Sequence, residues 1–228
     1  MFKKFSIISF FLILGYNYIG GYMKYVPKMY KKTIFDIPYH KLLMEGIKCL
    51  VFDLDNTIAL IDERVPSKEV KDLFKKLNKD FSIFILSNNH SGKRVKSFAL
   101  ELGVKSINFA CKPFTRGLRK ISTNNNFAKE EMVIIGDQLV TDIYSGTRFG
   151  IKTILVDPLA EKDLWITKFN RIKENMKLRK YRKKNLFERG KYYEWEKVSW
   201  MWSNITRWKC ALGGLYSKFR EWLVSEMF

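Results

Sequence analysis

The sequence predicts an α/β fold of three layers, in which helices cover both faces of a mainly parallel sheet. Short apolar segments with the composition of buried strands recur along the chain, and a segment with helical spacing follows nearly every one. Strands that alternate with single helices are typical of a parallel sheet, because each crossover needs an element that returns the chain. The expected strands are residues 49–52, 82–86, 106–110, 132–135 and 152–156.

Start and stop signals mark the helices between these strands. Ser67 is a good N-cap for a helix whose apolar residues recur at helical spacing as far as Leu77. Gly103 suits the left-handed position that follows a helix end. The other expected helices are residues 92–102, 114–122 and 138–148.

The amino terminus has the pattern of a targeting or membrane-associating segment, which we place at residues 1–24. A lysine pair precedes an apolar run over residues 5–14, and no acidic residue occurs before Asp36. The run is short for a membrane-spanning helix, which needs about 20 residues. An amphipathic first helix is the alternative. Residues 25–40, which contain Pro27 and Pro38, are expected to be irregular.

Charge is the most unusual feature of the composition. The formal net charge of +19 implies a polyanionic neighbourhood, such as nucleic acid, an anionic membrane surface or a phosphorylated substrate. Hydrophobic residues make up 46% of the chain, which is enough for a core. The 3 cysteines lack ligand spacing and predict neither a disulfide framework nor a zinc site.

Residues 168–228 form a basic, Trp-rich extension that we expect to be helical. Lysine and arginine dominate residues 168–191, and apolar residues then recur at spacings of three and four. Basic residues near anionic lipid, and tryptophan at the headgroup level, favour a membrane surface as the partner. A helix packed on the domain and a site for single-stranded nucleic acid are the alternatives, and we disfavour nucleic acid.

The first candidate site is the stretch Asp53-Leu54-Asp55-Asn56-Thr57, directly after the first expected strand. Residues two apart on an extended backbone point to the same side, so Asp53 and Asp55 can both face the crevice at the carboxyl edge of the sheet. Buried carboxylates are costly unless a cation or a reaction uses them. The alternative is a polar turn that happens to contain two aspartates.

Polar residues also follow the next three strands. Ser87-Asn88-Asn89, Lys112-Pro113 and Gly136-Asp137, the last leading to Thr141-Asp142, come after the second, third and fourth expected strands. A hydroxyl, an ammonium group and further carboxylates therefore meet at one predicted edge. This set suits metal-assisted phosphoryl transfer, because Mg²⁺ prefers oxygen ligands and a carboxylate can accept a phosphoryl group.

The phrases DLDNT, SNN, KP and GDQLVTD, in that order, resemble the four motifs of the haloacid dehalogenase (HAD) superfamily of phosphohydrolases. More closely, with the later TKFNR, the chain resembles the class IIIA phosphatidylglycerophosphate phosphatase family of bacteria and mitochondria. The resemblance covers about residues 25–179. It implies a Rossmannoid HAD-like domain, which we place at residues 25–167, and Mg²⁺ as the cofactor.

The resemblance also implies a role for each matching residue. Asp53 would be the nucleophile, and Asp55 would protonate the leaving oxygen and then activate water. Asp53, the backbone carbonyl of Asp55 and Asp137 would hold Mg²⁺, and Asp142 would support the metal site. The residues implied to bind phosphate are Asn56, Thr57, Ser87, Asn88 and Lys112, with Thr57 also orienting the nucleophile loop.

Spacing argues against a cap domain. Each interval between Thr57, Ser87 and Lys112 has room for only one helix, its loops and a strand. An open site suits a large or surface-held phosphate monoester. We therefore expect a Mg²⁺-dependent phosphatase that hydrolyses phosphatidylglycerophosphate to phosphatidylglycerol, a cardiolipin precursor, at a membrane surface.

Two other functions remain open: a HAD phosphatase for a phosphoprotein or a nucleic-acid end, and a non-catalytic membrane-bound scaffold. The expected location is an organelle membrane, mitochondrial first, with a plastid-type organelle or the secretory route as alternatives. We further expect that truncation after about Tyr181 spares hydrolysis of a soluble aryl phosphate.

Overall fold

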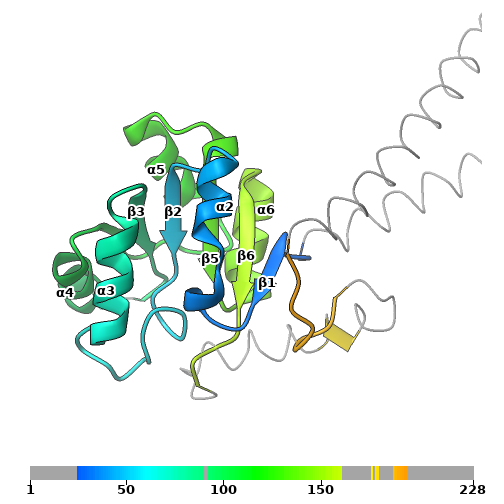
Figure 1. The fold of residues 1–228 in the computed structure, drawn as a ribbon, viewed down its shortest axis with the longest axis horizontal. Coiled ribbons are helices and arrows are strands. Elements are labelled where there is room, and N and C mark those ends of the chain that lie inside the picture. Colours follow the sequence, from blue (N-terminus) through cyan, green and yellow to red (C-terminus); the bar gives the residue numbers. More distant parts are fainter. Residues whose placement is uncertain (1–24, 90–91, 161–175, 177, 180–186, 195–228) are drawn as a thin grey trace, which may run out of the picture. The chain divides into compact units, whose positions relative to one another are not determined.

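The described residues form a parallel sheet with the strand order β1-β6-β5-β2-β3-β4 (Figure 1). The computed structural model describes residues 25–89, 92–160, 176, 178–179 and 187–194. The predicted segment 1–24 and most of the predicted extension, including every residue after 194, lie outside these residues. The strands are β1 (Met29–Lys31), β2 (Cys49–Phe52), β3 (Ser82–Leu86), β4 (Lys105–Ile107), β5 (Met132–Gly136) and β6 (Lys152–Val156).

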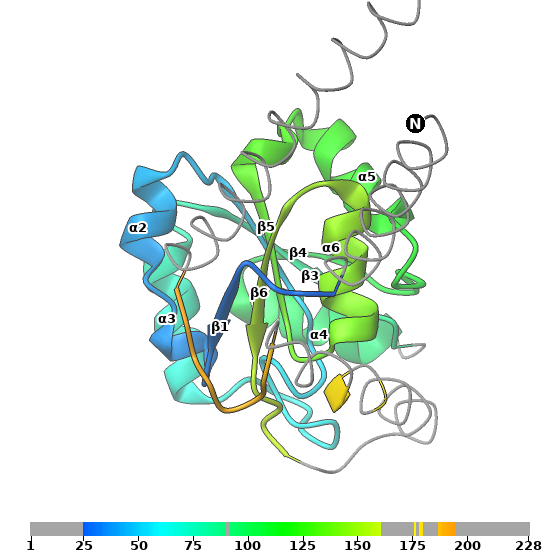
Figure 2. The ribbon, with the colours of Figure 1, turned by 90° about the vertical axis from the view of Figure 1, so that its right-hand side faces the viewer.

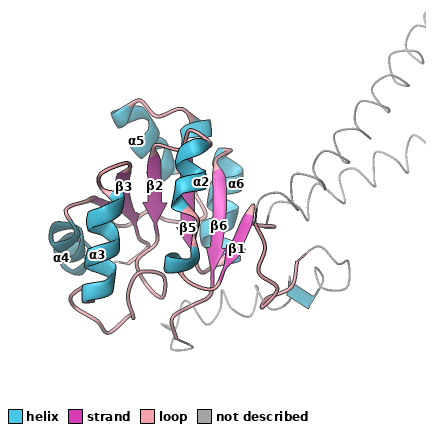
Figure 3. Cartoon of the chain, in the orientation of Figure 1, coloured by secondary structure: helices cyan, strands magenta, loops and turns pink. Residues whose placement is uncertain are grey.

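Helices cover both faces of this sheet, as the sequence predicts. Figure 2 shows α2 and α3 on one side and α5 and α6 on the other, and Figure 3 shows the same alternation of helix and strand. The helix α4 packs against α3, β3 and β4. The helices are α2 (Tyr39–Met44), α3 (Lys68–Leu77), α4 (Gly92–Leu102), α5 (Arg116–Asn125) and α6 (Tyr144–Phe149), with short helical turns η1 (Ile34–Asp36), η2 (Lys129–Glu131) and η3 (Leu139–Ile143).

The central strand β2 is buried on both faces, which is why its sequence is a continuous apolar run. Val51 belongs to a core cluster with residues of α5, β5 and α6. Phe52 has the opposite direction, and its ring lies 5.0 Å from the ring of Phe74 on α3. Burial on both faces fixes the register of β2 and hence the place where its carboxyl end presents polar residues.

Two of the predicted helix boundaries are confirmed by their caps. The Ser67 hydroxyl accepts a hydrogen bond from the backbone N–H of Val70 at 3.3 Å. Gly103 follows α4 with a φ of 66°, in the region that favours glycine. The intervals β2–β3 and β3–β4 each contain one helix, α3 and α4, so the open α/β architecture without a cap between these strands is confirmed.

The prediction of an irregular segment at residues 25–40 is wrong. β1 pairs in parallel with β6, and α2 begins at Tyr39, directly after Pro38. A strand of three residues is too short to show alternation in the sequence, and a proline before the first helical residue marks a start rather than a break.

The segment around Lys112 also differs from the prediction. β4 ends at Ile107 rather than at residue 110, because Phe109 and Cys111 both have a φ of 52°, which interrupts extended backbone. α5 then begins at Arg116 instead of residue 114. The chain between strand and helix is therefore a longer loop than expected, and Lys112 lies within it.

The helix predicted at residues 138–148 is two elements. Leu139–Ile143 forms a wide π-type turn, and α6 continues from Tyr144. Such turns are uncommon and often occur at functional sites. Among the described residues, no helix has the length and apolar character needed to cross a membrane.

Candidate active site

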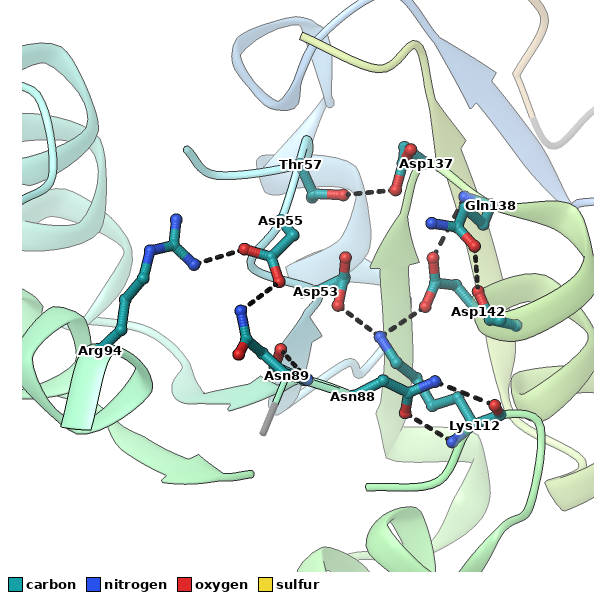
Figure 4. A network of polar contacts seen from close by, with 12 residues as sticks. Asp53, Asp55, Thr57, Asn88, Asn89, Arg94, Lys112, Asp137, Gln138 and Asp142 are labelled. Carbon is teal, nitrogen blue, oxygen red and sulfur yellow. Dashed lines mark hydrogen bonds and ion pairs between the residues drawn. The ribbon is translucent and has the colours of Figure 1, made fainter. Parts of the chain in front are cut away.

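The candidate site lies where β2, β4 and β5 end, at the carboxyl edge of the sheet (Figure 4). Asp53 directly follows β2, and Asp137 directly follows β5. Asp142 comes from the wide turn η3. One ligand atom from each of these three buried carboxylates lies within 4.8 Å of the other two. The structure thus brings these carboxylates together at one edge of the sheet, as the sequence predicts.

Lys112 links two of these carboxylates. Its Nζ donates to Asp53 Oδ1 and lies 2.7 Å from Asp142 Oδ1. All three side chains are less than 10% exposed, at 2%, 8% and 1% for Lys112, Asp53 and Asp142. Burial lowers the pKa of Lys112, but the two carboxylates outweigh it and raise the pKa overall. Lys112 therefore stays cationic and offsets the charge of the cluster.

Asp53 carries an unusual pKa for a carboxyl group. Burial raises the pKa to about 7, Lys112 opposes the increase, and the charges of Asp142 and Asp55 add to it. A carboxylate that is dry and electrostatically crowded gains from any cation placed beside it. Oxygen ligands from Asp53, Asp137 and Asp142 are the donors that a hard divalent cation prefers, so these residues fit such an ion.

The backbone of Lys112 is fixed by Asn88. The Asn88 Oδ1 accepts from the Lys112 N–H at 2.6 Å, and its Nδ2 donates to the Lys112 carbonyl at 3.0 Å. Direct phosphate binding by Asn88 stays a prediction, and in the structure its side-chain amide contacts the Lys112 backbone. Asn88 acts here as a clamp that positions the lysine.

Ser87 and Thr57 lie close to the carboxylates. Ser87 is buried, and its Oγ accepts from the Asn89 N–H at 3.0 Å, which leaves the hydroxyl hydrogen to donate. The Thr57 Oγ1 donates to Asp137 Oδ1 at 3.4 Å. Thr57 thus connects residues 53–57, which follow β2, to the segment that follows β5. Direct phosphate binding by Ser87 and Thr57 stays a prediction.

Asn56 shapes the nucleophile loop through its backbone. Its φ of 62° is left-handed, a conformation that asparagine tolerates better than most residues. Its N–H donates to the Ala59 carbonyl at 2.8 Å, and its carbonyl accepts from the Leu159 N–H at 3.0 Å. Since the Asn56 N–H is used inside the turn, any phosphate contact would have to come from the buried side chain.

Asp55 occupies a different environment from Asp53. Its Oδ1 accepts from Arg94 Nη1, and its Oδ2 accepts from Asn89 Nδ2 at 3.1 Å. Arg94 also donates to the backbone carbonyls of Glu63 and Leu60, at 2.8 and 2.7 Å. The guanidinium therefore holds the carboxylate and the loop after β2 in one arrangement, and both Asp55 oxygens accept hydrogen bonds.

Close packing at the β5 end leaves no room for a side chain at residue 136. A Cβ on Gly136 would lie 2.4 Å from the Asp142 carboxyl group. The same carboxylate accepts from the Gln138 N–H through Oδ2 at 3.1 Å. The glycine therefore allows Asp142 to fold back over the strand end and reach Lys112.

Arg189 reaches the same edge from the predicted extension. Its Nη2 donates to the Asp137 carbonyl at 3.0 Å, and its Nη1 lies 3.5 Å from Asp157 Oδ1. Asp157 also accepts from the hydroxyls of Tyr30 and Tyr192. Nearby, Phe187 is buried with its ring 5.3 Å from that of Tyr30. This part of the extension belongs to the compact unit of residues 1–192.

These contacts bear on one expectation, which stays a prediction. Truncation after residue 181 would remove Arg189 and its hydrogen bond to the Asp137 carbonyl. The sequence also gave no role to Asn89, Arg94 or Arg189. Arg94 had a usable signal, because a cation in the first turn of a helix is unfavourable unless it has a specific partner. Arg189 lies in a run of basic residues and has no such signal.

Comparisons with known proteins agree with this geometry. The sequence model of the family described as mitochondrial PGP phosphatase matches residues 22–160. The probable phosphatase YqeG of Bacillus subtilis is 37% identical over 148 residues, which cover 64% of this chain and 86% of YqeG.

Two relatives from photosynthetic organisms are more distant. Phosphatidylglycerophosphate phosphatase 1, chloroplastic/mitochondrial, of Arabidopsis thaliana is 26% identical over 60% of this chain and 42% of the relative. Phosphatidylglycerophosphate phosphatase 1, chloroplastic, of Chlamydomonas reinhardtii is 25% identical over a match that covers 69% of this chain and 61% of the relative. This chain spans less than two thirds of either relative. With the family match over most of the α/β domain, the chain belongs to the mitochondrial PGP phosphatase family and is a HAD-type phosphoric monoester hydrolase.

Proposed function

We propose that this protein is a Mg²⁺-dependent phosphatase that converts phosphatidylglycerophosphate to phosphatidylglycerol through an aspartyl-phosphate intermediate. The single observation that carries the reaction type is the buried cluster of Lys112 with Asp53 and Asp142, adjacent to Asp137. A cluster that concentrates carboxylates around one cation suits the binding of a phosphoryl group together with a second cation.

In the first step, Asp53 attacks the phosphorus atom and the bond to the leaving oxygen breaks. Lys112, which contacts Asp53, is placed to neutralise charge on the phosphoryl oxygens. Asp55 supplies the proton that the leaving alkoxide takes up. Asp53, the Asp55 carbonyl and Asp137 would hold Mg²⁺, which would supply further charge neutralisation and alignment.

In the second step, a water molecule attacks the phosphorus of the aspartyl phosphate. Asp55, now ionised, accepts the proton of that water. The bond between Asp53 and phosphorus breaks, and phosphate leaves with the original carboxylate restored. The hydrogen bonds from Arg94 and Asn89 to the two Asp55 oxygens fix the orientation of this carboxyl group.

The substrate assignment is supported by the family and by two relatives that are named as phosphatidylglycerophosphate phosphatases. The absence of a cap between β2, β3 and β4 supports a large substrate. We further propose an organelle membrane as the location, from the chloroplastic and mitochondrial names of those relatives and the net charge of +19. Residues 1–24 and 168–228 would provide targeting and membrane contact in addition to the 25–167 domain.

The test is phosphate release from phosphatidylglycerophosphate in mixed micelles, with and without Mg²⁺. We expect wild-type protein to turn over the lipid only with the metal, and Asp53→Asn to lose activity by a factor on the order of 10⁴ while it stays folded. Asp72→Asn, an exposed aspartate on α3, is the matched control and should retain wild-type activity.

Competing functions give different results in the same assay. Much faster cleavage of a phosphopeptide or a 3′-phosphorylated oligonucleotide than of the lipid would contradict the substrate assignment. A biological phenotype that Asp53→Asn leaves unchanged would favour a scaffold role over either enzyme.

A further inference from the structure

Exposed apolar side chains gather in the loops at the carboxyl edge of the sheet. Among the described residues, 10 large apolar side chains are exposed, and 5 of these follow the carboxyl ends of strands. They occur after β1, β2, β4 and β6, so they come from four separate loops. These residues are Phe35 (50% exposed), Val65 (57%), Phe109 (53%), Phe114 (62%) and Leu159 (45%).

The loops that carry these residues are attached to the catalytic machinery. Phe114 lies two residues after Lys112, and its ring faces the Arg148 guanidinium at 5.7 Å. The backbone N–H of Leu159 donates to the Asn56 carbonyl at 3.0 Å. Val65 follows a loop whose carbonyls accept from Arg94. Phe114, Leu159 and Val65 therefore lie on segments that contact residues of the candidate site or directly follow them.

Charge at this edge is mostly positive. In the described residues of the loops and the first two residues of α3, α4 and α5, the exposed basic side chains are Lys32, Arg64, Lys68, Lys93 and Arg116, and the exposed acidic ones are Asp36, Asp62 and Glu69. Asp36 is in addition bonded to the Thr33 N–H at 2.9 Å. A surface that combines exposed apolar residues with excess positive charge is complementary to the headgroup region of an anionic bilayer.

We propose that the carboxyl edge itself is the face that docks on an anionic membrane, with side chains such as Val65 and Phe114 entering the headgroup region. This inference rests on the proposed function and names its partner. Docking of this edge places Asp53 toward the headgroups, so a phosphate monoester reaches the nucleophile while its acyl chains stay in the bilayer. A cap between these strands would block docking of this edge as well as access of a large substrate, and the intervals β2–β3 and β3–β4 contain only α3 and α4.

The test uses the full-length chain and two matched pairs of substitutions. The edge variant is Val65→Ser with Phe114→Ser. The control variant is Met44→Ser with Leu100→Ser, which changes side chains that are 84% and 83% exposed. Met44 ends α2 just before β2 begins, and Leu100 is near the end of α4 just before β4 begins, so both belong to the opposite edge of the sheet.

Two measurements are made on each variant. The first is sedimentation with vesicles of phosphatidylcholine that contain phosphatidylglycerol. The second compares hydrolysis of phosphatidylglycerophosphate in those vesicles with hydrolysis of a soluble short-chain form. We expect the edge variant to lose about tenfold in vesicle partitioning and vesicle turnover, because two apolar side chains no longer enter the membrane. Turnover of the soluble form should be unchanged, as should every property of the control variant.

Equal vesicle partitioning by the edge and control variants would overturn the proposal. So would tight binding to a phosphopeptide without binding to vesicles, which would identify a protein partner instead. Failure of the proposed function has a different signature, because the wild-type protein would then hydrolyse neither the soluble nor the vesicle form of the lipid. In that case the vesicle sedimentation of the two variants still decides whether this edge docks.

Discussion

Asp53 and Asp55 are only two residues apart in the segment after β2, but one is in a buried charge cluster and the other is at the rim of the site. Asp53 is 8% exposed and shares Lys112 with a second buried carboxylate. Asp55 is 19% exposed and accepts from Arg94 and Asn89 at the rim of the site. The buried half is a charge cluster that is costly to disturb. The rim half is partly exposed to solvent.

This difference fits two different tasks. In the proposed mechanism the buried half binds a phosphoryl group of fixed shape, and a preorganised cation does this without reorganisation. In the same mechanism the rim half gives a proton to one substrate oxygen and later takes a proton from water. Both oxygens of Asp55 accept N–H donors in the structure, and each oxygen keeps a further lone pair for a proton.

The largest effect is expected from removal of the central cation. Lys112→Met would leave Asp53 and Asp142 buried without their common partner. We expect activity to fall by about 10³ or more, and the free energy of unfolding to fall by about 3 kcal/mol. Turnover of an aryl phosphate and urea denaturation measure the two effects.

A matched variant sharpens this result. Adding Asp53→Asn to Lys112→Met removes one of the two stranded charges, so part of the lost stability should return while activity stays absent. Additive destabilisation by the two substitutions would show that the cluster is not coupled as the geometry indicates.

The rim half gives a smaller but more specific effect. Arg94→Gln removes the ion pair to Asp55, and we expect turnover to fall by about tenfold to a hundredfold. The loss should be larger for an alkyl phosphate, whose leaving oxygen needs a proton, than for a nitrophenyl phosphate, whose leaving group does not. Steady-state rates on both substrates measure this.

Lys93→Gln is the matched control, because it removes an exposed cation from the adjacent position of α4. It should leave both rates unchanged. An equal loss on the alkyl and aryl substrates in Arg94→Gln would mean that Arg94 serves only the loop after β2 and does not position Asp55.

The same contrast explains what the sequence could predict. Asp53 and Asp137 directly follow the buried strands β2 and β5, and their position at one edge follows from the parallel sheet. Periodicity and caps were sufficient for this part of the fold. Contacts that depend on the path of a loop were not predictable, because loop geometry is set by a few dihedral angles such as the positive φ at Phe109.

The failures follow the same rule. The contact of the Asn88 amide with the Lys112 backbone was not predictable, because it depends on the path of the Lys112 loop. β1 has three residues and no readable period. Arg189 reaches Asp137 across a separation in sequence that no local pattern encodes.

A pH effect on metal binding is expected from Asp53. Burial, opposed by Lys112, raises the pKa of Asp53 to about 7 from an ordinary value of 3.8. A raised carboxyl pKa means that this group favours the folded metal-free protein most at low pH, and that the contribution is lost as pH rises through 7. A cation has to displace that proton, so Mg²⁺ affinity should fall by up to about tenfold for each pH unit below 7.

Calorimetric titration of Mg²⁺ at pH 6, 7 and 8 measures this dependence. The Asp53→Asn variant has no titrating group at that position and should show a much flatter profile. An affinity that is constant from pH 6 to 8 in the wild-type protein would mean that Asp53 is already ionised at pH 6.

The smallest effect is expected at the point where the extension meets the site. Arg189→Gln removes the donor to the Asp137 carbonyl, and we expect the Mg²⁺ concentration for half-maximal activity to rise by about threefold to tenfold. Calorimetric titration should show the same change in affinity without substrate. Lys191→Gln is the control. Lys191 is 77% exposed, and its Nζ lies 2.8 Å from Glu188 Oε2 on the same segment.

Truncation then distinguishes anchoring from membrane contact. A chain that ends after Tyr192 keeps Arg189 and its contacts with Asp157 and Asp137, and should match the wild-type metal requirement on a soluble aryl phosphate. A chain that ends after Tyr181 should resemble Arg189→Gln. Identical metal requirements in the two truncated chains would show that the segment carrying Arg189 does not support the β5 loop.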